Sequence, residues 1–252
     1  MQQIFLHTRG ENMISTNDLK QTRIYLALAF SVALAATACS TEVARQEPTP
    51  TTVLEAPAAD LAKDYLAAKT SSAGLERLVK TGAFGGSGAR FIVKIQGEEV
   101  NNDNVDEYVA KYQEQLSLHE GAIRQRGFKT IAGQYTGKAT ESCARSNAMW
   151  AALIQSQRHR AIEITQEDMD AQVNITVEHK GKEVNVKNRA AVAESAMALV
   201  EASNSDYYFR GAIKDNIIVF KPDLSVLRTW PKWANPPSQR DLEQCVVTLE
   251  RI

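Results

Sequence analysis

The chain lacks the features that mark several large protein classes. Lys and Arg number 29 against 30 Asp and Glu, so neither sign of charge is in excess and the net charge is -1. Nucleic-acid binding depends on clustered Lys and Arg, and this balance predicts no nucleic-acid partner. No apolar run approaches the roughly 20 residues of a membrane-spanning helix. The composition predicts a soluble globular domain.

Familiar catalytic and metal-binding motifs are also missing. The chain contains no Gly-x-Ser-x-Gly, no His-Glu-x-x-His and no Cys-x-x-Cys. The acidic cluster Glu163, Glu167, Asp168 and Asp170 fits a polar strand face followed by a turn. We therefore expect no cofactor, no metal ligands and a non-enzymatic role. The alternative is a hydrolase that uses Cys143 or a pair of carboxylates.

Residues 1–38 have the layout of a signal peptide. A basic segment at 20–23 precedes the mostly apolar run Ile24–Ala36, and small residues follow it. The apolar run is too short to remain as a membrane-spanning anchor. Met13 is an alternative start, because residues 1–12 add nothing to this layout. We predict export from the cytoplasm and removal of residues 1–38.

The apolar run ends in Ala36-Thr37-Ala38-Cys39, which resembles the lipobox of bacterial lipoproteins. In that family the cysteine becomes the new N-terminus, its sulfur carries a diacylglyceryl group and its amine is acylated, commonly with palmitate. The resemblance implies a membrane anchor on Cys39, and Ser40 after it implies an outer membrane location facing the periplasm. Ala36 departs from the Leu that the family prefers. An Ala-x-Ala cleavage site, with a secreted or periplasmic product, is the alternative.

The small number of cysteines favours the lipid anchor. The three are Cys39, Cys143 and Cys245. If Cys39 is acylated, the other two form an even set in an oxidising compartment and can pair. We expect a disulfide between Cys143 and Cys245 that joins the first and last strands of one sheet.

The chain after Cys39 divides into three predicted segments. Residues 39–57 are polar and rich in Pro and Thr, which predicts a flexible tether about 50 Å long. Residues 58–127 are expected to be helical with one strand near 89–96. They include one helix that ends near residue 69, a short second one at 72–80, and a third from 105 to 126 that packs on the sheet.

Residues 128–252 alternate in short runs and predict an antiparallel β domain. The Ala-rich stretch near 188–203 interrupts this texture and is expected to be a helical insertion. The fold class is therefore α+β, with an N-terminal helical segment before a β-meander. The meander curls into a small barrel or strongly twisted sheet that the disulfide closes.

Part of this domain is loosely similar to small secreted lipocalin-like β-barrels. The pattern is Gly133-x-Tyr135-x-Gly137, then Cys143, then Ile162-x-Ile164-x-Gln166 and a last strand that carries Cys245. The resemblance implies a barrel and assigns no ligand residues. Four aromatic side chains are candidate contacts at the barrel mouth: Tyr135, Tyr208, Trp230 and Trp233. The partner would be a small apolar ligand, an envelope protein or a cell-wall component; core packing and loop anchoring are the alternative roles.

Overall fold

A computed structural model describes residues 50–85, 91–202, 207–230 and 235–252, which lie in one compact unit, Pro48–Ile252. The predicted signal peptide, Cys39 and residues 39–49 of the predicted tether lie outside the described residues. The helices are α1 (Pro50–Glu55), α2 (Ala58–Lys80), α3 (Val105–Arg126), the 3-10 helix η1 (Glu141–Arg145), α4 (Met149–Gln155), α5 (Val226–Thr229) and α6 (Gln239–Gln244). The strands are β1 (Ile92–Ile95), β2 (Glu98–Asn101), β3 (Gly133–Ala139), β4 (His159–Glu167), β5 (Asp170–His179), β6 (Lys182–Ala193), β7 (Ala196–Val200), β8 (Tyr208–Lys214), β9 (Ile217–Pro222) and β10 (Val247–Arg251).

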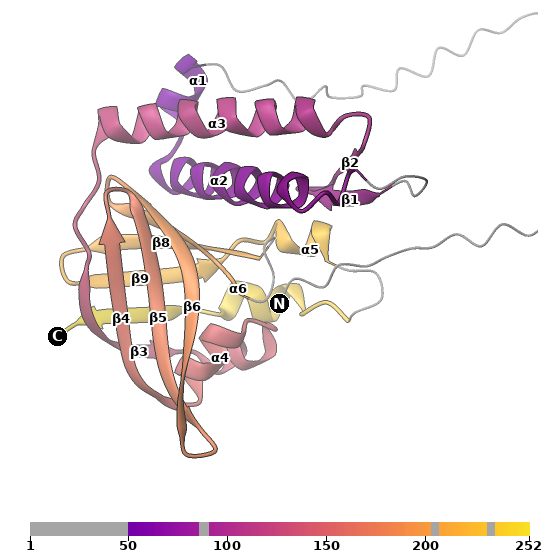
Figure 1. Cartoon of the computed structure of the whole chain (residues 1–252). Coiled ribbons are helices and arrows are strands. Elements are labelled where there is room, and N and C mark those ends of the chain that lie inside the picture. The colour runs from indigo at the N-terminus through magenta and orange to yellow at the C-terminus, as the bar shows by residue number, and fades with distance from the viewer. Residues whose placement is uncertain (1–49, 86–90, 203–206, 231–234) are drawn as a thin grey trace, which may run out of the picture. The chain divides into compact units, whose positions relative to one another are not determined.

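Strands β3 to β10 form a closed antiparallel barrel (Figure 1). Each strand pairs with its neighbours in the chain, and β10 pairs with both β9 and β3. The register of the closing pair places Val247 opposite Ala139 and Arg251 opposite Tyr135. The predicted α+β class and the β-meander that curls into a barrel are confirmed.

Two-residue turns join most of the successive barrel strands. The turns between β4 and β5, β5 and β6, β6 and β7, and β8 and β9 each contain a residue other than glycine with positive φ: Asp168, Lys180, Glu194 and Asp215. Backbone of this hand matches the right-handed twist of the flanking strands. The tight turns therefore hold each strand against the next one in the chain.

Large side chains fill the barrel interior. Alternate residues of the strands point inward, as in Ile162 and Ile164 of β4 or Met197 and Leu199 of β7, and these side chains are almost completely buried. Gly211 leaves the space that its neighbours need. A Cβ at Gly211 would lie 2.6 Å from a ring carbon of Phe220.

The helices cover one outer face of the barrel. Figure 1 shows α2 between α3 and the strands, and α2 contacts β6, β7 and β8. Small outward residues on these strands, Ala191, Ala193 and Ala198, allow the helix to approach closely; they share a buried cluster with Leu61 and Leu66 of α2. Residues of β6 and β7 are therefore buried on both faces.

This two-sided burial corrects the prediction of a helical insertion near 188–203. Its residues 188–200 form the end of β6, a tight turn and β7. Burial on both faces removes the alternation of polar and apolar residues that identifies a strand, because both faces are apolar. The alanines favour a helix by local propensity, but in the structure their small side chains allow α2 to pack closely against the strands.

The helical segment also differs in detail from its prediction. Residues Ala58–Lys80 form one continuous helix, without the predicted break between residues 69 and 72. Ser71 and Ser72, next to that break, are buried within α2. A second strand accompanies the expected one, and β1 and β2 form an antiparallel hairpin. Helix α3 packs on α2 instead of the sheet, because α2 already occupies the apolar barrel face.

The last part of the predicted tether is helical. Residues Pro50–Glu55 form α1, and Val53 is buried. Arg126 Nη1 donates hydrogen bonds to the carbonyl oxygens of Leu54, at 3.2 Å, and Ala56, at 2.5 Å. A polar segment thus becomes ordered because α3 supplies donors and a contact surface that the segment lacks by itself.

Ion pairs surround the apolar contact between helices and barrel. Arg126 Nε donates to Glu194 at 2.7 Å, and Arg124 contacts Asp168 at 3.2 Å. Asp223, after β9, is buried and accepts from Arg210 Nε and Nη2 at 3.1 and 3.0 Å. Lys63 of α2 contacts the same carboxylate at 3.2 Å.

Burial alone would raise the pKa of Asp223. The hydrogen bond from the Ser225 N–H, at 3.0 Å, and the charges of Lys63 and Arg210 outweigh it and lower the pKa to about 2. Asp223 is therefore ionised throughout the physiological pH range and holds α2 to the barrel.

Replacing Gly211 by Ala is expected to destabilise the domain by about 1–3 kcal/mol, because the added methyl group overlaps the Phe220 ring. Urea unfolding measures the change. Gly74→Ala in α2 is the matched control: a Cβ there meets nothing within 4 Å, and alanine is the better helix former. Equal stability of Gly211→Ala and the wild type would contradict the packing described.

Replacing Asp223 by Asn is expected to lower stability near neutral pH by on the order of 2 kcal/mol. A carboxyl with a lowered folded-state pKa stabilises above its unfolded pKa of about 3.9 and loses that contribution as the pH falls to about 2. The wild-type and variant curves of unfolding free energy against pH should therefore converge over this acid range. Asp215→Asn, at an exposed turn, is the control and should leave the curve unchanged. Parallel curves for Asp223→Asn would refute the assignment.

Candidate functional site

Helix α4 covers the end of the barrel at which β3 stops. The chain leaves β3, forms η1 and then α4, whose inner face carries Trp150, Ala151 and Ile154 into the interior cluster. Gly137 of β3 leaves room for this helix, since a Cβ there would lie 3.1 Å from Ile154 Cγ2. Met149, on the opposite face of α4, is exposed. This end of the barrel is therefore filled by a helix.

A row of aromatic rings runs inward from the same end. Trp230 meets Tyr207 edge to face at 6.1 Å, and Tyr207 stacks on Phe209 at 5.1 Å. Trp150 meets Phe209 at 4.9 Å and Phe220 at 5.5 Å, both edge to face. These separations are typical of favourable aromatic contacts inside a core. These described rings therefore pack on one another within the core.

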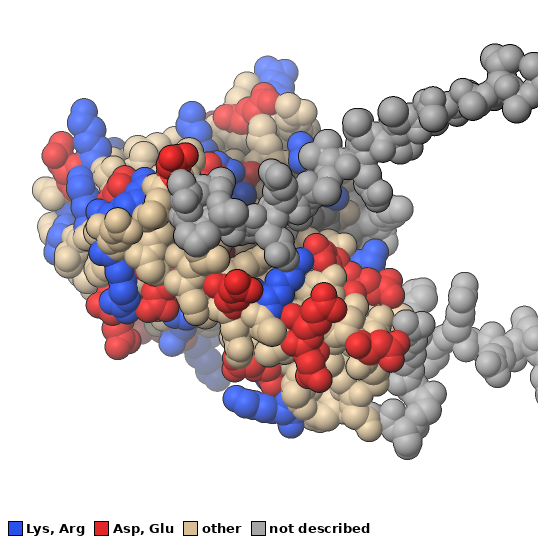
Figure 2. Space-filling view, turned by 90° about the horizontal axis from the view of Figure 1, so that it is seen from above, with Lys and Arg blue, Asp and Glu red and all other residues tan. Residues whose placement is uncertain are grey.

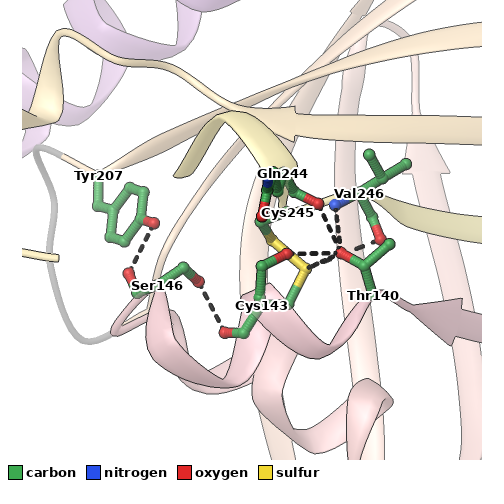
Figure 3. Close-up of a disulfide and its surroundings, with 8 residues drawn as sticks. Thr140, Cys143, Ser146, Tyr207, Gln244, Cys245 and Val246 are labelled. Carbon is green, nitrogen blue, oxygen red and sulfur yellow. Dashed lines mark hydrogen bonds between the residues drawn. A yellow bond between two sulfur atoms is a disulfide. The ribbon is translucent and has the colours of Figure 1, made fainter. Parts of the chain in front are cut away.

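The disulfide joins η1 to the end of α6, two residues before the last strand. Cys143 and Cys245 are bonded, with their Cα atoms 4.6 Å apart, and both are completely buried. Figure 3 shows Thr140 beside them: its Oγ1 donates to the Gln244 carbonyl at 2.8 Å and accepts from the Val246 N–H at 3.0 Å. The predicted pairing is confirmed, and it closes the barrel at the β3 and β10 ends.

Polar groups at this end are buried with the aromatic rings. Tyr207 Oη donates to the Ser146 carbonyl at 2.8 Å (Figure 3). Burial is the main cause that raises the pKa of Tyr207, and the Glu201 carboxylate raises it further. The phenol is therefore neutral and acts as a donor. Asn188, also completely buried, accepts the Ala202 N–H through Oδ1 at 3.0 Å.

The aromatic residues singled out from the sequence do not share a surface. Tyr135 lies inside the barrel, near the start of β3, and donates to the Ile131 carbonyl at 2.6 Å. Tyr208 lies in the buried cluster between the barrel wall and α2. Trp230 is partly buried and packs on the α4 end, and Trp233 lies outside the described residues. The structure thus separates Tyr135, Tyr208 and Trp230.

Two members of the acidic cluster predicted as a strand face and turn, Asp168 and Asp170, contact the helices. Asp170 accepts from Tyr65 Oη at 3.1 Å and forms an ion pair with Lys69 of α2. Asp168 pairs with Arg124, as described above. Burial is the main cause that raises the pKa of Tyr65, and the Asp170 charge adds to it. These carboxylates are therefore engaged in holding the helices.

The histidines do not form a metal site. His119 is buried on α3, where its Nδ1 lies 2.6 Å from the Gln115 carbonyl. His159 begins β4 and His179 ends β5. Across the described ranges, no three His, Cys, Asp or Glu side chains are grouped closely enough to hold a metal ion.

Trp150, Gly137 and Gly211 were not identified from the sequence as residues that fill or shape the barrel. Ser146–Gln157 is helical by propensity, but nothing local indicates that its Trp150 enters a barrel interior. Gly137 belongs to the Gly133-x-Tyr135-x-Gly137 pattern, but that pattern does not show its contact with α4. Gly211 carries no local signal, because its role depends on neighbours distant in the sequence.

Charge does not mark a binding face in the view that Figure 2 presents. Lys and Arg are interspersed with Asp and Glu on the side where α3 lies. Among the helices of the described segments, none combines the length and apolar character needed to cross a membrane.

Comparison with protein-family models, with curated proteins and with solved structures finds no match to this chain. The eight-stranded closed barrel agrees with the loose lipocalin-like resemblance at the level of architecture.

Removing the disulfide by the double substitution Cys143→Ala and Cys245→Ala is expected to lower the free energy of unfolding by roughly 4 kcal/mol. The cause is the larger conformational freedom of the unfolded chain, since the bond spans 102 residues. Urea unfolding with and without a reductant measures it. The reductant should destabilise the wild type and leave the double variant unaffected. A wild type whose transition is insensitive to complete reduction would rule this contribution out.

Proposed function

We propose that the chain is a lipid-anchored protein of the bacterial cell envelope whose barrel domain is a non-enzymatic binding or interaction module. The observation that carries this proposal is the filled interior: α4 and the aromatic row occupy the barrel end at which β3 stops. A filled barrel favours contacts made by the outer surface. It supports an envelope protein or a cell-wall component as partner over a small apolar ligand.

The cysteines support the anchor. Cys143 and Cys245 are bonded to each other, which leaves Cys39 as the unmatched cysteine. Acylation of Cys39 would account for it, and Ser40 favours the outer membrane with the domain facing the periplasm. The disulfide also weakens the hydrolase alternative, because a bonded sulfur supplies no thiolate nucleophile.

The length of chain between the anchor and the domain limits where the module works. Helix α1 begins at Pro50 and is attached to the domain through Arg126. Ten residues lie between Cys39 and Pro50, so eleven Cα–Cα steps join the two. A fully extended chain of this length spans at most about 40 Å. The module would thus contact partners close to the bilayer, nearer than the roughly 50 Å expected from the sequence.

The anchor is tested by the mass and location of the mature protein. We expect the wild type to begin at Cys39, to carry the added mass of its acyl groups and to sediment with membranes. Cys39→Ser should lose the acyl mass and leave the membrane fraction, with the Cys143–Cys245 bond intact as evidence of folding. A mature protein that carries no acyl group and is soluble in the envelope would establish plain secretion instead.

The interaction role is tested by cross-linking in cells and identification of what the domain contacts. A discrete protein or cell-wall fragment captured by the wild type, and reduced for Cys39→Ser, would support a partner near the membrane. Capture of only a small apolar molecule would overturn the argument from the filled interior.

A further inference from the structure

The β5–β6 hairpin extends beyond the rest of the barrel (Figure 1). Strand β6 pairs with β5 from Lys182 onward, but its pairing with β7 begins only at Arg189. Within the described residues no strand pairs with Lys182–Asn188 on the side away from β5. The side chains of Lys182–Asn185 and Lys187 are exposed. This segment, which we name the β6 edge, is a free strand edge on an otherwise closed barrel.

The backbone of the β6 edge presents its hydrogen-bonding groups outward at alternate residues. The pair His179 and Lys182 closes a two-residue turn and is therefore a hydrogen-bonded pair. Because such pairs alternate along an antiparallel ladder, Lys182 and Val184 bond to β5. The N–H and C=O groups of Glu183, Asn185 and Lys187 point to the free side. The pair Ala193 and Ala196 also closes a two-residue turn and is hydrogen-bonded. Counting back along β6 from this pair, the same odd-numbered residues direct their backbone groups away from β5.

The residues of the β6 edge are complementary to themselves. Their order, Glu183-Val184-Asn185-Val186-Lys187, is symmetric in polarity about Asn185 and opposite in charge at its ends. In an antiparallel pair centred on Asn185, Glu183 would face the partner's Lys187, and Val184 would face the partner's Val186. Every outward backbone group of the segment would meet its counterpart, since Asn185 opposite the partner's Asn185 is a hydrogen-bonded position.

An unfavourable contact within one chain also favours pairing of two copies. Glu183 lies directly opposite Glu178 on β5, and like charges in this position are destabilising. Glu178 also forms an ion pair with Arg160 of β4. In the pair of copies, the partner's Lys187 would stand on the other side of Glu183. The row would then have a positive charge at each end of the two glutamates.

The apolar face of the β6 edge is incomplete in one chain. Val184 is 43% exposed although it lies opposite Val177, which is buried. Val186, opposite Ile175, is partly buried. Pairing two copies would place Val184 beside the partner's Val186, so that the apolar row of β5 and β6 continues into the second hairpin.

We infer that two copies of this chain associate through their β6 edges, as an antiparallel pair centred on Asn185 that joins the two barrels in one continuous sheet. This inference does not depend on the lipid anchor or on the proposed partner. A common anchor in one membrane would favour it by raising the local concentration of the copies.

Cysteine cross-linking of the full chain in the cells that produce it tests the register. Asn185→Cys is expected to form a disulfide-linked dimer under mild oxidation, because the two Cα atoms would lie about 5.5 Å apart. Lys180→Cys, at the exposed turn of the same hairpin, is the matched control, since it would lie far from its counterpart. If Asn185→Cys cross-links no faster than Lys180→Cys, the inference is wrong.

Charge reversal in the Asn185→Cys background tests the pairing energy. Glu183→Lys or Lys187→Glu alone would place like charges opposite each other twice, and should lower the initial cross-linking rate about tenfold. The double reversal restores opposite charges and should recover the rate to within about threefold. Lys138→Glu, an exposed reversal on β3, is the control and should not change it.

These variants separate association from misfolding. Glu183→Lys replaces a repulsive neighbour of Glu178 by an attractive one, so the monomer should not lose stability. The fraction of chains with the Cys143–Cys245 bond reports folding in each variant. Equal rates for the single and double reversals, with this bond formed in all of them, would overturn the proposed register.

Discussion

The pairing of β3 with β10 is the constraint on which the rest of the structure depends. Once these strands meet, the meander becomes a closed wall with an inside and an outside. The disulfide secures the closure beside it, because Cys143 follows β3 and Cys245 precedes β10. Inward residues must then fill a fixed volume, and Trp150 of α4 and the glycines at 137 and 211 fit that requirement.

Closure also determines how the helical segment is used. A barrel of alternating residues normally presents a polar outer face, but β6 and β7 carry alanines there and require a cover. Helix α2 supplies it, and ion pairs at its margin fix its position over the barrel. Helix α3 and the β1–β2 hairpin then form a further layer, centred on Leu75, Val100 and Tyr112. The β6 edge has a different cause. Strand β7 is shorter than β6, so it leaves the outer part of the β5–β6 hairpin without a neighbouring strand on that side.

The filled interior changes what the barrel can do. A lipocalin-like barrel suggests an interior that binds a ligand, but here side chains of the aromatic row and of α4 fill the interior. The candidate contacts Tyr135 and Tyr208 are occupied within the molecule, one inside the wall and one outside it. The proposed interaction role therefore rests on the outer surfaces, and the proposed anchor would restrict the distance at which those surfaces operate.

The sequence by itself determined what rests on local pattern and on counting. The alternating strands, the helix up to Gly127 and the pairing of Cys143 with Cys245 follow from adjacent residues or from the small number of cysteines. The layout of an export signal is also a local pattern, and export stays a prediction. Only the tertiary structure decided the identity of 188–203, the helical end of the predicted tether and the position of α3. Each of these depends on burial by residues distant in the chain: two apolar faces hide a strand pattern, and α3 orders a segment that has no apolar period of its own.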